Sequence, residues 1–343
     1  MATIVGGEAW VNTATGVDDT SHGEASGTPC ATLLYLMTSR VGTLTSDLLV
    51  HCAGATAEAL TAASISGHST ATHKLTIKGD RWTSTTNGLY STSYYHLTQA
   101  ADNHMLTITE LNMELDGIQF DMINAGSGNM CLSIGAAAAI QQVTIKNCWL
   151  RKSAGGGGNY AITGTVFADA SSNFIIENSI ISGYTSAGDR GINATDYYVK
   201  VYNCTFHDCT VGIYGPADTV IVKNCIFDSC DAEATGAWED TSDYNSSTLD
   251  TTWDPVGSNN HDPCTDFNFA DLANHDFRPT ATSGQTNLRK TGVAIAGCTP
   301  DPLGTVRPSE GTGITRGAFE YIVPGGAASI VPIMVEEQVR RRQ

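Results

Sequence analysis

The chain has 343 residues, of which 41 % are hydrophobic and only 15 % are charged, and it contains 35 glycines. This composition favours short strands joined by tight turns over long helices. The net charge of −17 repels phosphate and argues against a nucleic-acid partner, and no apolar run reaches the roughly 18–20 residues that a membrane span requires.

The ten cysteines are expected to be free, buried thiols. The first residues show no basic and apolar leader of the secretory kind, so we expect the chain to be made in a cytoplasm, where thiols stay reduced. No cysteines are spaced as a Cys-x-x-Cys pair, and the spacing predicts no metal site.

Residues 1–40 are predicted to form an N-terminal loop and a short capping helix. A polar stretch from Trp10 to Asp19 precedes Gly27-Thr-Pro-Cys-Ala-Thr-Leu33 and a short apolar segment that ends at Met37. A stack of coils exposes its hydrophobic interior at its ends, and a helix across the first coil would close it.

Residues 41–230 contain an internal repeat that predicts stacked coils. Val199-Lys-Val-Tyr-Asn-Cys-Thr-Phe-His-Asp-Cys209 returns 21 residues later as Val220-Ile-Val-Lys-Asn-Cys-Ile-Phe-Asp-Ser-Cys230. Looser copies or weaker strand-like segments precede this pair at 48–52, 75–78, 106–109, 143–149 and 174–180. One copy cannot bury a core alone, so the copies must stack.

Each copy has an alternating strand, Val-x-Val, a turn at Asn and a second short strand, Cys-x-Phe. Stacking places equivalent side chains about 4.8 Å apart. Asn suits the turn because it tolerates the left-handed conformation and can both donate and accept hydrogen bonds. We therefore expect a column of mutually bonded turn amides and a column of inward-facing free thiols. The amide column comprises Asn147, Asn178, Asn203 and Asn224, and the thiol column comprises Cys148, Cys204 and Cys225.

Residues 231–321 are predicted to form an irregular acidic excursion and the C-terminal closure of the rod. The part from 231 to 276 holds eleven Asp or Glu and no Lys or Arg. The expected fold class is all-β: a single-stranded right-handed parallel β-helix with a short N-terminal capping helix and an irregular C-terminal closure. An antiparallel sandwich is the alternative, but sandwich strands do not need the same turn residue at matched offsets.

Both ends of the chain resemble the right-handed β-helix repeat proteins of the pectin-lyase-like superfamily, of the kind found in bacteriophage structural proteins. The matching segments are Trp10–Asp19, Gly27–Leu33, Asp276-Phe-Arg278, Asp301-Pro-Leu-Gly-Thr-Val-Arg307 and Gly317-Ala-Phe-Glu-Tyr321. One departure is Thr315-Arg316, where this family usually has an acidic residue. The resemblance implies the fold but no single function, because the fold serves lyases, epimerases, adhesins and virion parts.

The best catalytic candidates are His207, Asp208 and Asp228, since the repeat places Asp228 directly over His207. Sugar lyases need a base and a cation, and hydrolases need paired carboxylates. The repeats offer only Lys200 and Lys223 as nearby cations, and the catalytic patterns of alginate epimerases and pectate lyases are not visible. A solvated His–Asp contact is the favoured interpretation.

The acidic excursion carries three candidate glycan contacts, Trp238, Trp253 and Tyr244. Rings that cover the flank of the rod are the alternative. Ca²⁺ binding near Glu239 and Asp243 has no supporting motif, because calcium needs about six to eight converging oxygens.

Residues 322–343 are predicted to be a docking arm, with a disordered terminus as the alternative. The arm comprises the apolar residues Ile330, Val331, Ile333, Met334 and Val335 and the basic residues Arg340, Arg341 and Arg342. Its apolar part would bury in a groove of a partner, and its arginines would pair with acidic groups there.

Three functions stay open at this point. We expect a non-enzymatic phage virion protein, either a capsid decoration or a small appendage, assembled in the host cytoplasm. It would bind capsid or other virion proteins through its arm and form a homo-oligomer, with a trimer favoured. A glycan-binding adhesin of the tailspike kind and a polysaccharide lyase or epimerase are the alternatives. None of these readings calls for a cofactor or a membrane.

Overall fold

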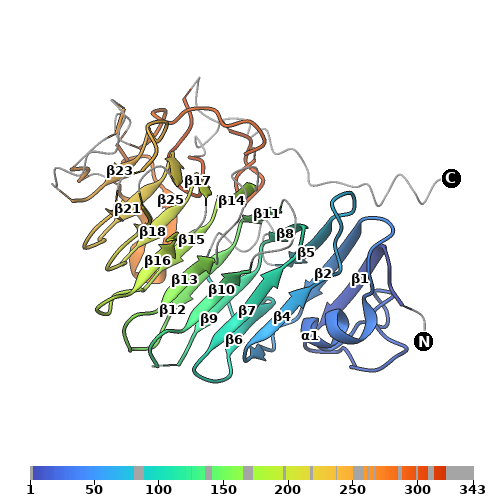
Figure 1. The fold of residues 1–343 in the computed structure, drawn as a ribbon. Helices are drawn as coiled ribbons and strands as arrows, with labels where there is room; N and C mark the ends of the chain where they lie inside the picture. The colour runs from blue at the N-terminus through green and yellow to red at the C-terminus, as the bar shows by residue number, and fades with distance from the viewer. Residues whose placement is uncertain are drawn as a thin grey trace.

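The computed structural model describes residues 3–80, 89–124, 126–135, 141–164, 173–195, 198–216, 219–236, 238–249, 259–260, 263–265, 267–284, 288–298, 300–307 and 313–321. Within these ranges, parallel strands form three sheets that run along one rod (Figure 1). Each coil gives a strand to the first sheet, then to the third, then to the second. The protein is therefore a right-handed parallel β-helix, and the predicted fold class is confirmed.

The strands of each sheet follow in spatial order. The first sheet contains β1 (Gly7–Asn12), β2 (Leu48–Ala53), β5 (Leu75–Gly79), β8 (Asn112–Asp116), β11 (Gln142–Lys146), β14 (Asn173–Glu177), β17 (Val199–Tyr202) and β20 (Val220–Lys223). The second contains β4 (Ala63–Ser66), β7 (His104–Thr109), β10 (Met130–Ile134), β13 (Tyr160–Gly164), β16 (Arg190–Asn193), β19 (Ile213–Tyr214) and β22 (Ala234–Thr235). The third contains β3 (Glu58–Leu60), β6 (His96–Gln99), β9 (Gln119–Met122), β12 (Trp149–Lys152), β15 (Ile180–Ser182), β18 (Thr205–His207), β21 (Ile226–Asp228) and β23 (Ser246–Ser247).

Equivalent side chains of the repeat lie on one another inside the rod. Val199 pairs with Val220 in the first sheet, and Phe206 pairs with Phe227 in the third. The two phenyl rings stack with centroids 4.8 Å apart and planes 8° apart. The core is therefore a set of columns, because alternation along each strand sends every second side chain inward.

A short helix closes the first coil, as the sequence predicts. It consists of α1 (Leu33–Tyr35), with one α-helical turn, and η1 (Leu36–Arg40), with π-helical geometry. Both backbone N–H groups at its start, those of Leu33 and Leu34, donate to the buried carboxylate of Glu58 over 2.9 Å. Tyr95 donates its hydroxyl to the same carboxylate over 2.6 Å, so the first coils hold the cap in place.

The stack of coils is longer at both ends than the sequence indicated. β1 pairs with β2 inside the segment expected to be a loop, and β22 and β23 continue the second and third sheets beyond residue 230. The strand pair at β23 was missed because its residues, Ser246 and Ser247, are small and polar and yet fully buried. Neither of them carries the apolar pattern of the other coils.

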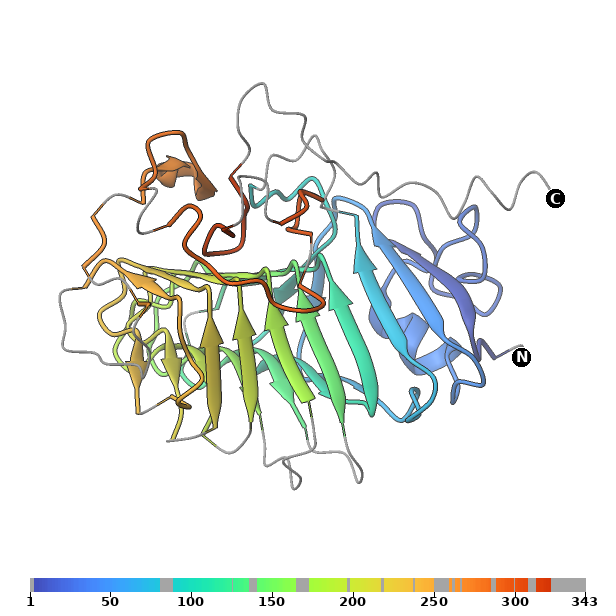
Figure 2. The same cartoon turned by 90° about the horizontal axis from the view of Figure 1, so that it is seen from above.

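The C-terminal segment lies along one side of the rod instead of closing only its end. Figure 2 shows this orange and red segment beside the strands of the earlier coils. Its antiparallel hairpin is formed by β24 (Phe269–Asp271), the 3₁₀ turn η2 (Leu272–Asn274) and β25 (Asp276–Pro279). The Phe277 ring packs on the Trp149 ring of β12, with centroids 5.8 Å apart. The closure thus covers the outer face of the third sheet.

Candidate functional site

The four repeat asparagines all occupy the turn between the first and third sheets. Their φ angles lie between 49° and 57°, the left-handed conformation that their sequence position predicts. Asn224 donates its amide to the Asn203 carbonyl oxygen over 3.0 Å, so the predicted amide column exists at this step.

The amide column is not continuous, which corrects the prediction. Asn147 donates to Asp116 over 2.6 Å, and Asn178 donates to the backbone carbonyl of Pro300 over 3.0 Å. Asn224 also donates to the carbonyl of Val293 over 2.7 Å. The returning C-terminal chain offers carbonyl groups at the turns, and these compete with the neighbouring amide in the column.

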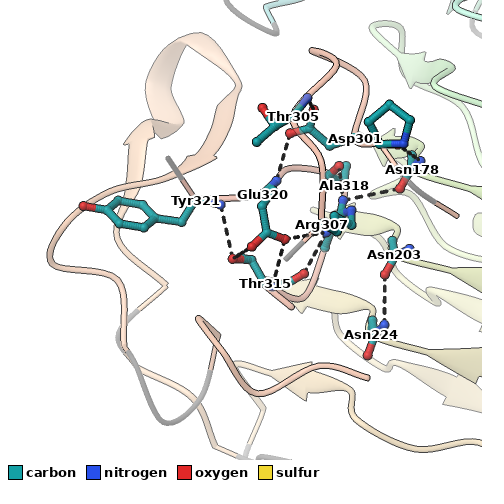
Figure 3. Close-up of polar contacts among 12 residues, drawn as sticks. Asn178, Asn203, Asn224, Asp301, Thr305, Arg307, Thr315, Ala318, Glu320 and Tyr321 are labelled. Atoms are coloured by element: carbon teal, nitrogen blue, oxygen red, sulfur yellow. Dashed lines mark hydrogen bonds and ion pairs between the residues drawn. The ribbon is translucent and has the colours of Figure 1, made fainter. Parts of the chain in front are cut away.

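A buried polar network fastens this returning chain to the turns (Figure 3). Arg307 pairs with Glu320 over 3.3 Å, and both side chains are fully buried. The same guanidinium donates to the backbone carbonyl of Ala318 over 2.6 Å and to the Asn178 side chain over 3.3 Å. Asp301 accepts from the backbone N–H of Glu320 over 3.0 Å. The two closing motifs of the sequence therefore form one clasp on the flank of the coils.

Arg316, the departure from the family pattern, has a structural role in the last coil. Its buried guanidinium donates to the backbone carbonyl of Asn245 and, over 3.0 Å, to the hydroxyl of Ser246. It also donates to the carbonyl of Asn259 over 2.7 Å. Burial lowers the pKa of Arg316 to about 10. A cation here binds carbonyl groups that an acidic residue could not bind.

The three cysteines of the predicted column lie in the core, with one serine among them. Cys148, Cys204 and Cys225 are fully buried, and all ten cysteines are free. In the coil between the first two, Ser179 takes the same place, and its hydroxyl accepts from the N–H of Cys148 over 3.1 Å. The thiols act as small apolar filler in the core.

His207 and Asp228 meet as predicted but are not solvated, which corrects the expected exposure. They are register partners in β18 and β21, and His207 Nδ1 lies 2.8 Å from Oδ2 of Asp228. His207 Nε2 lies 3.1 Å from Oδ2 of Asp208, so each ring nitrogen faces a carboxylate. The hairpin covers the pair, with the Phe277 ring 5.0 Å from the His207 ring. The position of this hairpin follows no repeat, so the sequence did not indicate the burial.

The His–Asp pair belongs to a longer polar row on the outer face of the third sheet. Register partners along this row are Asp121, Arg151, Ser182, His207 and Asp228. The first three were not predicted from the sequence, although each follows an inward apolar residue at the same place in its copy. Arg151 supplies the cation that the repeats lacked, and its guanidinium lies 2.5 Å from Asp121 and 3.6 Å from the centre of the Tyr90 ring.

The charged members of this polar row pair with protein groups. Arg151 is paired with Asp121, and His207 with Asp228 and Asp208. Above the row, burial lowers the pKa of His275, and electrostatic interactions with His207 and Arg151 lower it further. A neutral His275 would fit proton transfer at neutral pH. Its ring, however, packs edge-on against the rings of Trp149 and His207.

Of the three predicted glycan contacts, the structure describes Trp238 and Tyr244. Trp238 is only 3 % exposed and packs on the Phe227 ring at 5.6 Å, so it belongs to the core and cannot stack on a sugar. Tyr244 is half-buried in the last coil. Trp253 and the docking arm at 330–342 lie outside the described residues.

Among the residues that the structure describes, no group of three or more His, Cys, Asp or Glu side chains is placed to hold a metal ion. Glu239 and Asp243 are not part of any such group.

No helix within the described residues has the length and apolar character needed to cross a membrane.

A comparison with protein families matches most of the coils. The model of the family described as "Rhamnogalacturonase A/epimerase, pectate lyase-like" matches residues 58–235, just over half of the chain. No curated protein and no solved structure matches. The matched segment contains the complete polar row and all four turn asparagines. The chain therefore belongs to the rhamnogalacturonase A/epimerase, pectate lyase-like family.

Proposed function

We propose that this protein is a non-enzymatic structural protein of a bacteriophage particle, displayed as a capsid decoration or small appendage. One observation carries the non-enzymatic part: both ring nitrogens of His207 face carboxylates of the protein itself, beneath the hairpin. A general base needs a lone pair directed at the substrate. The best candidate base is instead engaged in the packing of the rod.

The attachment point of the proposed docking arm is buried against the rod. Tyr321, the last described residue, is buried, and its N–H donates to the hydroxyl of Thr315 over 3.2 Å. Arg289 covers its ring at 3.7 Å. An arm that follows this residue would transmit load to the flank of the coils, which suits a protein held on a particle. We propose capsid or other virion proteins as its partners, and a trimer of parallel rods as its assembly.

The test of this function is incorporation into particles. Full-length protein and a variant lacking residues 323–343 are supplied to particles that lack their own copy, and purified particles are assayed for the protein. We expect incorporation to be lost while the thermal unfolding of the variant stays that of the rod. A variant with the order of residues 323–343 scrambled is the matched control for length and charge. Normal incorporation of either variant would reject the arm.

A second candidate is a polysaccharide lyase or epimerase, because the matched family segment includes Arg151, His207 and Asp228 in one row. The hairpin would have to move to expose them. Incubation with acidic polysaccharides, followed by ultraviolet absorbance for a lyase and by proton NMR of the sugar residues for an epimerase, separates the two candidates. A rise in unsaturated-uronate absorbance that is lost in His207→Ala would establish the lyase and reject the non-enzymatic proposal.

A further inference from the structure

A small hollow opens between the end of β21 and the β24–η2 segment, away from the clasp. Its volume is about 280 Å³. The residues that line it are Asp228, Thr248, Cys264, Thr265, Phe267, Asn268, Phe269 and Leu272. Two kinds of surface meet there: an apolar wall from the C-terminal segment and a polar wall that includes the last residue of β21.

The apolar wall is firmly built but incompletely covered. Phe267 is buried with Cys264 in a small apolar cluster, and its ring lies 5.7 Å from the ring of Phe269. Leu272, at the rim, is 41 % exposed. A large apolar side chain beside a hollow gains free energy when a ligand covers it.

The polar wall carries negative charge. Asp228 is only 6 % exposed, and its Oδ2 atom is held by His207 Nδ1 at 2.8 Å. The Thr248 hydroxyl oxygen accepts from the N–H of Ser229 over 2.9 Å. Among the described residues that line the hollow, Asp228 is the one charged side chain, and the whole chain carries a net charge of −17. Both features favour a cation over an anion as the ligand.

We propose that this hollow binds an alkylammonium group. The ammonium would lie against the Asp228 carboxylate, where a charge-assisted hydrogen bond is stronger than a neutral one. The methylene chain would lie on Phe267, Phe269 and Leu272, where aromatic faces also attract a cation. Two kinds of ligand carry an alkylammonium group: a free aliphatic amine and the lysine side chain of another protein. The inference does not depend on the phage role.

The ligand itself provides the first test. Full-length protein is titrated with n-butylammonium, with its neutral analogue 1-butanol and with the anion butyrate, and the backbone amide signals of Thr248, Asn268 and Leu272 are followed by NMR. We expect saturable shifts with n-butylammonium. The affinity for each analogue should be weaker than that for n-butylammonium by about tenfold or more. Equal affinity for 1-butanol, or no shifts with n-butylammonium, would overturn the proposal. Lysine blocked at both termini distinguishes the sources: binding indicates a protein partner, and its absence alongside n-butylammonium binding indicates a free amine.

Two neighbouring carboxylates provide the matched variants. Asp228→Asn should weaken n-butylammonium binding about tenfold to hundredfold, because the charge is lost while the shape is kept. Asp208→Asn removes a carboxylate from the same histidine but outside the hollow, and it should bind as the unchanged protein does. Leu272→Ser, at the exposed rim, should weaken binding severalfold without threatening the fold. Unchanged binding in both Asp228→Asn and Leu272→Ser would contradict the site.

Discussion

Asn224 and Val293 exchange two hydrogen bonds: the Asn224 amide donates to the Val293 carbonyl over 2.7 Å, and its oxygen accepts from the Val293 N–H over 2.9 Å. The Asn224 side-chain amide thus pairs with the backbone of the returning chain as the backbone of a neighbouring strand would. The residues are 69 positions apart in the sequence. This pair shows how the repeat asparagines serve both the column and the closure.

Replacement of Asn224 by Gly should destabilise the protein by about 2–3 kcal/mol. Glycine keeps the left-handed turn, so the loss reports on the three side-chain bonds at roughly 0.5–1.5 kcal/mol each. Asn147→Gly is the control, because the bond that the structure describes for its amide joins it to Asp116 of the neighbouring coil. Urea unfolding measures both, and equal losses would show that the clasp contributes nothing at Asn224.

Replacement of Arg307 by Met should cost about 3–5 kcal/mol, because Glu320 would remain buried without its partner. Lys74→Met is the control. Its ion pair with Glu114, at 3.2 Å, is partly exposed on both sides, and its loss should cost about 1 kcal/mol or less. Guanidinium unfolding curves of the two variants decide the comparison, and similar costs would refute the importance of the buried network.

The contribution of Asp301 should make the protein more stable at acid pH. Burial raises the pKa of Asp301 from 3.8 to about 6. Between these values the folded state holds more protons than the unfolded state, so stability falls by about 3 kcal/mol as pH rises through this window. The unfolding free energy of the natural protein minus that of Asp301→Asn should fall by that amount between pH 4 and pH 7. A difference that grows with pH would contradict the sign.

Loss of Glu58 should release the capping helix. Glu58→Ala removes the acceptor of three donors and leaves them buried, at a cost of about 2–4 kcal/mol. Hydrogen exchange at residues 33–40 should accelerate first. Glu8→Ala, whose carboxylate is 55 % exposed and 3.8 Å from His51, should leave exchange at the cap unchanged. Unaltered protection in Glu58→Ala would mean that apolar packing alone holds the helix.

The repeat predicted whatever recurs from coil to coil. Val199 over Val220, Phe206 over Phe227 and Asp228 over His207 all follow from one alignment of two copies. The closure could not be predicted in the same way, because its contacts join residues with no shared period. Arg307 and Asn178, for example, are 129 positions apart. For the same reason, no repeat indicates that the hairpin buries His207 or that Trp238 packs inside the last coil.

The proposed role is tested most directly by electron cryo-microscopy of phage particles assembled with this protein, with the rod fitted into the density. We expect rods that project from the particle surface, each attached at the flank of the coils that carries Tyr321. Particles that show no rod density, while the intact protein stays in the soluble fraction, would contradict it.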